Sequence, residues 1–109
     1  MKISEIAEKL NLKSIVNASD EEISSGYVSD LLSDVVGNAR EGAALITVQV
    51  HKNVVAVANL VGLGAVIITH GRIPEEEALE AARKNGVNIL SSKESAFTVA
   101  GKLYEMGIR

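Results

Sequence analysis

The sequence contains no cysteine and no tryptophan, a single proline, and few aromatic residues, which make up 3% of its 109 residues. Without cysteine the chain can form neither a disulfide framework nor a thiolate metal site. The net charge is only -3 and hydrophobic residues make up 47% of the chain, which is not the composition of a disordered protein. The sequence pI near 5.3 also argues against a protein that binds nucleic acid.

No long hydrophobic run marks a signal peptide or a membrane-spanning helix. The long uncharged stretch Val54–Gly71 is interrupted by glycines and is shorter than the ~20 apolar residues that a bilayer requires. Residues 1–5 lack the apolar core of a signal peptide. We therefore expect a cytoplasmic protein with no membrane partner. A single domain over residues 1–109 is expected, since chains below ~150 residues seldom divide.

Apolar runs that alternate with helical patterns predict an α/β fold. Strands are predicted at residues 14–17, 43–48, 65–68 and 87–90, with helices before, between and after them. Residues 21–28 are ambiguous and leave an extended segment open. This order is typical of right-handed βαβ units. We expect a three-layer domain with a mostly parallel sheet of about four strands and helices on both faces.

Capping signals predict where the helices begin and end. The expected starting residues are Ser4, Ser29 or Asp30, Asn53, Pro74, and a capping box of Ser91 and Glu94. Gly62 and Gly86 are placed to end two of the helices.

Two of the predicted helices have notable apolar faces. Residues 54–61 are apolar nearly all round, which predicts burial on every side. Neighbouring helices and the sheet could provide that cover, or a partner subunit could, so this helix is a candidate surface for a homodimer. In the last helix, one stripe at helical spacing carries Phe97, Ala100, Leu103, Tyr104 and Gly107.

Polar side chains gather after the second and third predicted strands. They are Thr47, Gln49, His51 and Asn53 in one loop, and Thr69, His70, Gly71 and Arg72 in the other. Ligands of open parallel sheets bind beyond the carboxyl ends of the strands, and these two loops are expected to be neighbours there. The eight residues are therefore candidate ligand-binding residues. The alternative is that they serve only turns and helix caps.

No motif indicates catalysis, a metal or a cofactor. The sequence has neither the phosphate-binding loop of nucleotide hydrolases nor a G-x-G-x-x-G segment. Glu75, Glu76 and Glu77 disfavour a phosphate at the helix that follows Pro74. Two histidines are too few for a metal that needs three or four ligands, and no serine lies in a nucleophile motif. We therefore expect no enzyme activity, no metal and no cofactor.

Four segments of the chain carry a resemblance to a known family. They are Gly26–Val35, Ile46–Ala58, Ala65–Pro74 and Ala96–Tyr104. Together they resemble the small stand-alone DRTGG-domain proteins over most of the chain. The DRTGG domain is in turn similar to the amino-terminal domain of HPr kinase/phosphorylase, and it occurs as an accessory domain beside phosphotransacetylase and CBS-type pyrophosphatase modules. The resemblance implies an HPr kinase N-terminal-domain-like fold and a regulatory or assembly role.

The residues that give the family its name fall in the two polar loops. Its Thr-Gly-Gly segment corresponds to Thr69-His70-Gly71, where His70 replaces the middle glycine. Its Asp-Arg pair corresponds to Gln49-Val50, so neither charged residue is present. The catalytic P-loop domain of HPr kinase/phosphorylase has no counterpart in this sequence, and the resemblance does not imply kinase activity.

Three functions are compatible with these observations. The first is a non-catalytic regulatory module that forms a homodimer, as the resemblance implies, and senses a small polar or nucleotide-like ligand at the two loops. The second is a ligand-free interaction partner that docks on a separately encoded enzyme through the surface of residues 26–36. The third is a small hydrolase or transferase that uses His51 or His70 as a general base, for which no nucleophile, metal set or phosphate loop is visible.

Overall fold

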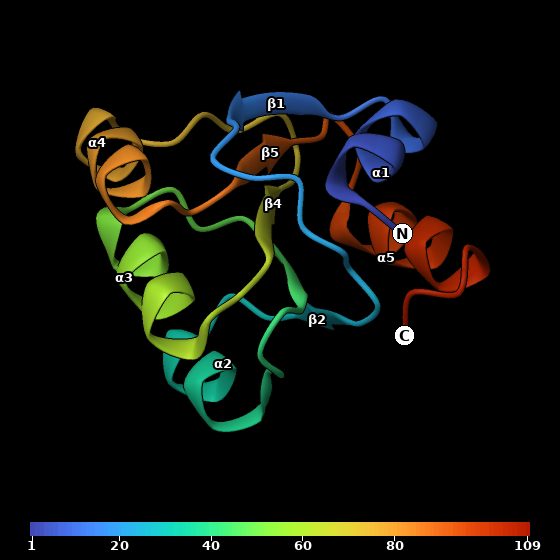
Figure 1. Cartoon of the computed structure of the whole chain (residues 1–109), viewed down its shortest axis with the longest axis horizontal. Helices are drawn as coiled ribbons and strands as arrows, with labels where there is room; N and C mark the ends of the chain where they lie inside the picture. The colour runs from blue at the N-terminus through green and yellow to red at the C-terminus, as the bar shows by residue number, and fades with distance from the viewer.

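One central sheet organises the chain in the computed structural model, which describes all of residues 1–109 (Figure 1). The strand order is β1-β5-β4-β3-β2, with β2 to β5 parallel and β1 antiparallel at one edge. The strands are β1 (Lys13–Val16), β2 (Gly26–Val28), β3 (Ala44–Thr47), β4 (Ala65–Ile68) and β5 (Ile89–Ser91). The predicted α/β class and mostly parallel sheet are confirmed. The sheet has five strands, against about four predicted, because the ambiguous segment supplies β2.

Five helices cover the two faces of the sheet. They are α1 (Ile3–Leu10), α2 (Leu32–Asn38), α3 (Lys52–Val61), α4 (Glu76–Asn85) and α5 (Ala96–Glu105). Figure 1 shows α2, α3 and α4 on one side of the sheet and α1 and α5 on the other. None of these helices is both long and apolar enough to cross a membrane. The three-layer arrangement predicted from the sequence is therefore confirmed.

The two central strands are buried along their whole length, which explains their unbroken apolar sequences. In β3, Leu45 packs with the α2–α4 side of the core, whereas Ala44 and Ile46 pack with the α1–α5 side. In β4, Val66 and Ile67 divide in the same way. Successive side chains of a strand point to opposite faces, so two separate apolar clusters form, one beneath each helical layer.

Helix α3 is covered mainly by elements of its own chain. Val54, Val55 and Ala58 are buried, and α2 and α4 both pack against the helix. Of its large apolar side chains, Leu60 remains exposed, at 73%. The predicted burial on every side was wrong, because Ala56 and Leu60 face solvent and Val57 and Val61 are half-buried.

Helix α5 buries a different stripe from the one expected. Val99 and Leu103, one turn apart, are the buried residues of the helix. Phe97 is 89% exposed and Tyr104 is 60% exposed. The expected stripe is confirmed at Leu103 but was wrong at Phe97 and Tyr104, which lie on the outer side of α5, where the chain provides no further layer to cover them.

Several predicted helix starts are displaced by a few residues. His51, and not Asn53, is the N-cap of α3, and Ser95, and not the Ser91–Glu94 pair, caps α5. Short polar residues are frequent on both sides of each helix start, so the sequence pattern alone does not select the capping one. The glycines expected to end α3 and α4 do so, with φ angles of 78° and 69°.

Two other expected helix starts were also wrong. Ser4 lies inside α1, where its hydroxyl and backbone N–H donate to the carboxylate of Asp20 over 2.8 and 2.9 Å, and Lys2 is the N-cap. Pro74 precedes the N-cap of α4, Glu75, and so lies just outside the helix. A partner distant in sequence engages Ser4, and no local signal reveals such a contact.

Candidate functional site

The loops that follow β3 and β4 lie against each other, as the sequence predicts. We name residues 47–53 the β3 loop and residues 69–72 the β4 loop. The backbone N–H that opens the β4 loop donates to the last carbonyl of β3 over 3.0 Å. The Arg72 Nη1 donates to the carbonyl of Val48 over 2.7 Å. The eight predicted site residues therefore fall in two adjacent segments at the carboxyl edge of the sheet.

Asp30 holds the β3 loop in place. Its carboxylate accepts from the buried Thr47 hydroxyl over 2.8 Å and from the Val48 N–H over 2.9 Å. The Gln49 side-chain amide donates to the backbone carbonyl of Asp30 over 2.8 Å. The sequence suggested Ser29 or Asp30 as the N-cap of α2, but Leu31 occupies that position. The polar groups of Thr47 and Gln49 are thus used to join the loop to the start of α2.

His51 and its neighbours are also engaged within the chain. The His51 Nδ1 accepts from the backbone N–H of Asn53 over 3.2 Å, which caps α3. Lys52 pairs with Glu77 of α4 over 3.1 Å. No group of three or more histidine, aspartate or glutamate side chains is close enough together to hold a metal ion. The β3 loop residues therefore serve mainly to position the loop and the start of α3.

The β4 loop is a tight turn with two residues in the left-handed region. His70 has a φ of 61° and Gly71 a φ of 66°, and the Arg72 N–H donates to the carbonyl of Thr69 over 3.3 Å. This combination defines a type I′ turn. The two central N–H groups donate to carbonyls of the segment Ser92–Glu94 over 2.9 and 2.7 Å. His70 therefore occupies a conformation that favours glycine, at a cost of about 1–2 kcal/mol, and leaves its side chain exposed.

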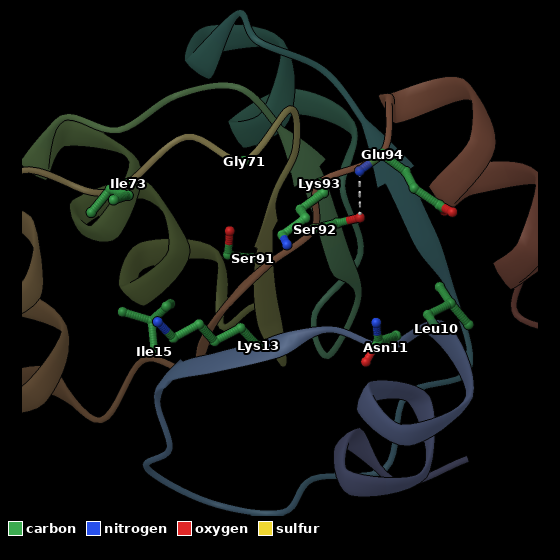
Figure 2. Close-up of a pocket in the computed structure, with 10 residues that line it drawn as sticks. All are labelled: Leu10, Asn11, Lys13, Ile15, Gly71, Ile73, Ser91, Ser92, Lys93 and Glu94. Carbon is green, nitrogen blue, oxygen red and sulfur yellow. Dashed lines mark hydrogen bonds between the residues drawn. The ribbon is translucent and has the colours of Figure 1, made fainter.

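A cleft of about 470 Å3 opens beside the β4 loop (Figure 2). It lies between β1, the carboxyl end of β5 and the end of α1. Open α/β sheets bind their ligands at the carboxyl ends of the strands. Its lining residues are Leu10, Asn11, Lys13, Ile15, Gly71, Ile73, Ser91, Ser92, Lys93 and Glu94. Of the eight residues predicted as a site, only Gly71 lines this cleft.

The cleft contains two lysines with no acidic partner. Lys13 and Lys93 form no ion pair with any residue of the chain. Glu94, the only acidic lining residue, is held by Lys102 of α5 through both carboxylate oxygens, at 2.9 and 3.0 Å. In Figure 2 its side chain extends toward α5. The cleft is therefore a positively charged surface on a chain whose net charge is -3.

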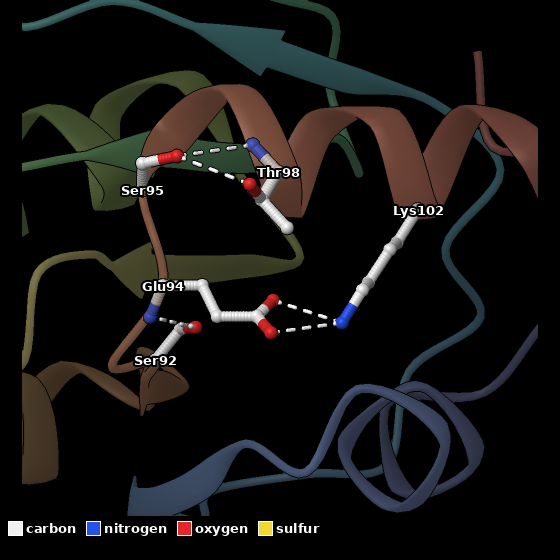
Figure 3. A network of polar contacts seen from close by, with 5 residues as sticks. All are labelled: Ser92, Glu94, Ser95, Thr98 and Lys102. Atoms are coloured by element: carbon white, nitrogen blue, oxygen red, sulfur yellow. Dashed lines mark hydrogen bonds and ion pairs between the residues drawn. The ribbon is translucent and has the colours of Figure 1, made fainter.

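A polar network joins the cleft to the start of α5 (Figure 3). The Ser92 hydroxyl accepts from the Glu94 N–H over 3.1 Å, and Glu94 binds Lys102 of α5. The next residue, Ser95, accepts from the Thr98 N–H over 3.2 Å and so caps α5. Ser92 in the cleft wall is therefore connected to α5 both through the adjacent chain and through these hydrogen bonds.

The outer side of α5 forms an apolar surface with the edge strand β2. Tyr104 and Val28 both line a shallow groove of about 150 Å3, and Phe97 lies two turns before Tyr104 on the same helix. The Arg109 guanidinium stacks over the Tyr104 ring, 4.6 Å from its centre. On the outer side of β2 no further strand is paired. Exposed apolar side chains beside an unpaired edge are typical of an interaction surface.

Three ionisable groups outside the cleft have shifted pKa values. The Tyr27 hydroxyl donates to Asp34 over 2.7 Å, which lowers the pKa of Asp34 below 3.8 and raises the pKa of Tyr27 above 10.0. The pKa of Asp20 is lowered by the backbone N–H of Ser4 and then by the Ser4 hydroxyl. All three shifts arise from contacts that join α1 or α2 to neighbouring segments.

The cleft residues were missed by the sequence analysis for two different reasons. Ser91 ends the last parallel strand and Lys93 follows it, so the rule that ligands bind at the carboxyl ends of strands could have found them. Lys13 belongs to β1, which joins the sheet antiparallel to β5, with Lys13 opposite Ser91. No signal in the sequence indicates that pairing.

Comparisons with known proteins agree with this architecture. The model of the DRTGG domain matches residues 5–106. The crystal structure of the CBS and DRTGG domains of the regulatory region of Clostridium perfringens pyrophosphatase, complexed with the activator diadenosine tetraphosphate, superposes with a TM-score of 0.75 at 17% identity. The match covers 91% of this chain and 44% of that one, so the chain spans less than half of that regulatory region. No curated protein matches the chain.

Proposed function

The chain belongs to the DRTGG-domain family, and we propose that its residues 1–109 form a non-catalytic regulatory module of the cytoplasm. In this proposal the module binds a small polar or nucleotide-like ligand and works as a homodimer. The enzyme that it regulates is a separate chain or another part of a longer one.

The cleft beside the β4 loop carries the ligand-binding part of the proposal. It combines a concave wall at the carboxyl edge of the sheet with side chains that have no partner within the chain, among them Lys13 and Lys93. The regulatory region of the pyrophosphatase with the similar fold binds a nucleotide activator. Both observations support a regulatory ligand.

The route from the cleft to α5 supports a regulatory role. Ser92 and Glu94 line the cleft and lead into α5 through the Ser95 cap. The outer side of that helix presents Phe97 and Tyr104. A ligand that shifts the Ser92–Glu94 segment would therefore move the surface on which a partner subunit or enzyme docks.

A thermal-denaturation screen tests whether a ligand exists. The panel contains adenine nucleotides, phosphorylated sugars and the corresponding uncharged nucleosides and sugars. A ligand of the folded state stabilises it by RT ln(1 + [L]/Kd), which is ~2.7 kcal/mol at a hundredfold excess over Kd. We expect at least one compound to raise the melting temperature. If no member of the panel does so, the ligand-sensing function is wrong.

Self-association is tested by size-exclusion chromatography with light scattering. We expect the 11.5 kDa chain to elute at twice its mass at micromolar concentration. Phe97→Ser combined with Tyr104→Ser should give a monomer, because both residues lie on the exposed side of α5. Leu60→Ser on α3, where the sequence first suggested an interface, is the control and should remain dimeric. A wild-type monomer would contradict the dimer.

A ligand-free interaction partner is the second candidate function. The surface of residues 26–36 carries three exposed apolar side chains, Val28 at 51%, Leu31 at 65% and Val36 at 46%. Such a surface suits docking on an enzyme without any small molecule. A chain that shows no ligand-induced stabilisation, but loses binding to its enzyme when Leu31 is changed to serine, would favour this candidate.

A further inference from the structure

The chemistry of the cleft specifies the class of its ligand more closely. We propose that the cleft binds the phosphate or diphosphate group of a small phosphorylated metabolite, held by Lys13 and Lys93. This inference rests on the proposed ligand-sensing function and names its ligand class. It places the binding site beside the β4 loop, with only Gly71 of the predicted site residues in its wall.

The charge of the cleft favours an anion over a neutral ligand. Lys13 and Lys93 have no acidic partner, and the carboxylate of Glu94 is neutralised by Lys102. Acidic residues outnumber basic ones in the chain, 14 to 11, so a wall with two unpaired lysines differs in sign from the whole. Two cations on one concave wall raise the local concentration of anions and bind them through charge-assisted hydrogen bonds.

Most of the hydrogen-bonding side chains of the cleft are able to donate. Lys13 lies opposite Ser91 in the β1–β5 pair, and Lys93 follows two residues later, so three side chains that can donate hydrogen bonds line the same cleft. The side chain of Asn11 faces the same space from the end of α1 (Figure 2). Lysine offers three N–H donors and no acceptor, which matches the oxygen atoms of a phosphate, all of which accept.

The rest of the cleft wall offers few specific contacts to the remainder of the ligand. Ile15 and Ile73 supply apolar surface, and no aromatic side chain lines the cleft. Without an aromatic ring a nucleobase cannot stack, so the base should contribute little to affinity. We therefore expect the phosphate group to be recognised largely irrespective of whether it belongs to a nucleotide, a sugar phosphate or free pyrophosphate.

Sodium pyrophosphate, ATP, glucose 6-phosphate and adenosine are the probes, compared at constant ionic strength in EDTA. Their dissociation constants are measured by calorimetry for three proteins. These are the wild type, the Lys13→Gln, Lys93→Gln double variant, and a control with Lys9→Gln and Lys84→Gln, which loses the same charge outside the cleft. We expect the phosphorylated probes to bind the wild type and the control alike. The cleft variant should bind at least about tenfold more weakly, since each lysine contributes a charge-assisted hydrogen bond.

Each outcome decides between the proposals. Equal losses in the cleft variant and the control would overturn the anion site, because they would show a general effect of charge. Binding of adenosine but not of pyrophosphate would also overturn it, while leaving the ligand-sensing function in place. Absence of binding by every probe and by the wider denaturation panel would overturn both. A selective loss in the cleft variant, restored in part by Lys13→Arg and Lys93→Arg, would support the site.

Discussion

The β3 and β4 loops and the neighbouring cleft differ in how their polar groups are used. In the loops, Thr47 and Gln49 bond to Asp30, Arg72 bonds to a backbone carbonyl, and His51 caps α3. In the cleft, two lysines have no ionic partner in the chain. The polar groups of the loops therefore hold the structure together, whereas the two lysines of the cleft are available to bind a ligand.

This contrast separates two roles that look alike in a sequence. Polar residues that follow a strand hold the chain in place in the β3 and β4 loops, whereas those that line the cleft are available to bind a ligand. Substitutions in the loops should therefore change stability, and substitutions in the cleft should change binding but not stability.

The largest effect is expected for Asp30→Ala. Loss of the carboxylate leaves the buried hydroxyl of Thr47 and the N–H of Val48 without their acceptor. The free energy of unfolding should fall by about 2 kcal/mol, as for other buried groups that lose a partner. Urea denaturation measures the change. Asp30→Asn keeps one acceptor oxygen and should lose clearly less; equal losses would show that the carboxylate does not hold the loop.

Substitutions in the type I′ turn are expected to change the free energy of unfolding by up to about 1 kcal/mol. Gly71→Ala places a Cβ at a φ of 66°, where no neighbouring atom lies within 4 Å, so the cost of about 1 kcal/mol is conformational strain alone. His70→Gly relieves the same kind of strain and should stabilise by about 0.5 kcal/mol, since the flexibility of glycine in the unfolded chain offsets part of the gain. Thermal and urea denaturation of the two variants should therefore shift in opposite directions. Shifts of the same sign would contradict the turn geometry.

The loss of unfolding free energy at acid pH should depend on the Tyr27–Asp34 contact. The pKa of Asp34 is lowered in the folded chain, so its contribution is present above the unfolded value of 3.8 and is lost as the pH falls through the folded value. Tyr27→Phe removes the largest cause of that shift. Between pH 5 and pH 3 the variant should lose less unfolding free energy than the wild type. Tyr104→Phe is the control, and it should behave as the wild type does.

The same contact predicts the alkaline limb with the opposite sign. The pKa of Tyr27 is raised in the folded chain, chiefly by Asp34, so its contribution is present below 10.0 and is lost as the pH rises through the folded value. Tyr27→Phe should flatten this limb as well. A variant that titrates as steeply as the wild type on both sides would show that the contact is absent in solution.

The smallest effect on stability is expected in the cleft. Lys13→Gln with Lys93→Gln removes two exposed side chains without ionic partners, so the unfolding free energy should change by less than about 0.5 kcal/mol. Urea denaturation in the absence of ligand measures it. A loss comparable to that of Asp30→Ala would mean that the lysines serve the fold, and the contrast between loop and cleft would fail.

Local patterns predicted the layers of the fold and the position of its polar edge. The apolar runs at β3 and β4 and the glycine ends of α3 and α4 are signals carried by adjacent residues, and the structure confirms them. The pairing of β1 with β5 and the contact of Ser4 with Asp20 join distant segments. Such contacts leave no mark on the local sequence.

The same limit explains what was missed about the site. The sequence located the two loops, but it could not show that Asp30, 17 residues before Thr47, would engage the hydroxyl of that residue. The sequence likewise could not show that Lys13 pairs with Ser91, because that pairing depends on the order of strands in the sheet. Finding which polar groups remain free requires the three-dimensional pairing of all the others.

Whether the cleft or the loops form the binding site can be tested directly by following the backbone amides of the wild-type chain by NMR during a titration with sodium pyrophosphate. Binding in the cleft should shift the amides of residues 11–13 and 91–94 most strongly, with saturation at a single dissociation constant. The shifts should vanish in the Lys13→Gln, Lys93→Gln variant. Shifts concentrated at residues 47–53, or shifts that persist unchanged in that variant, would contradict binding in the cleft.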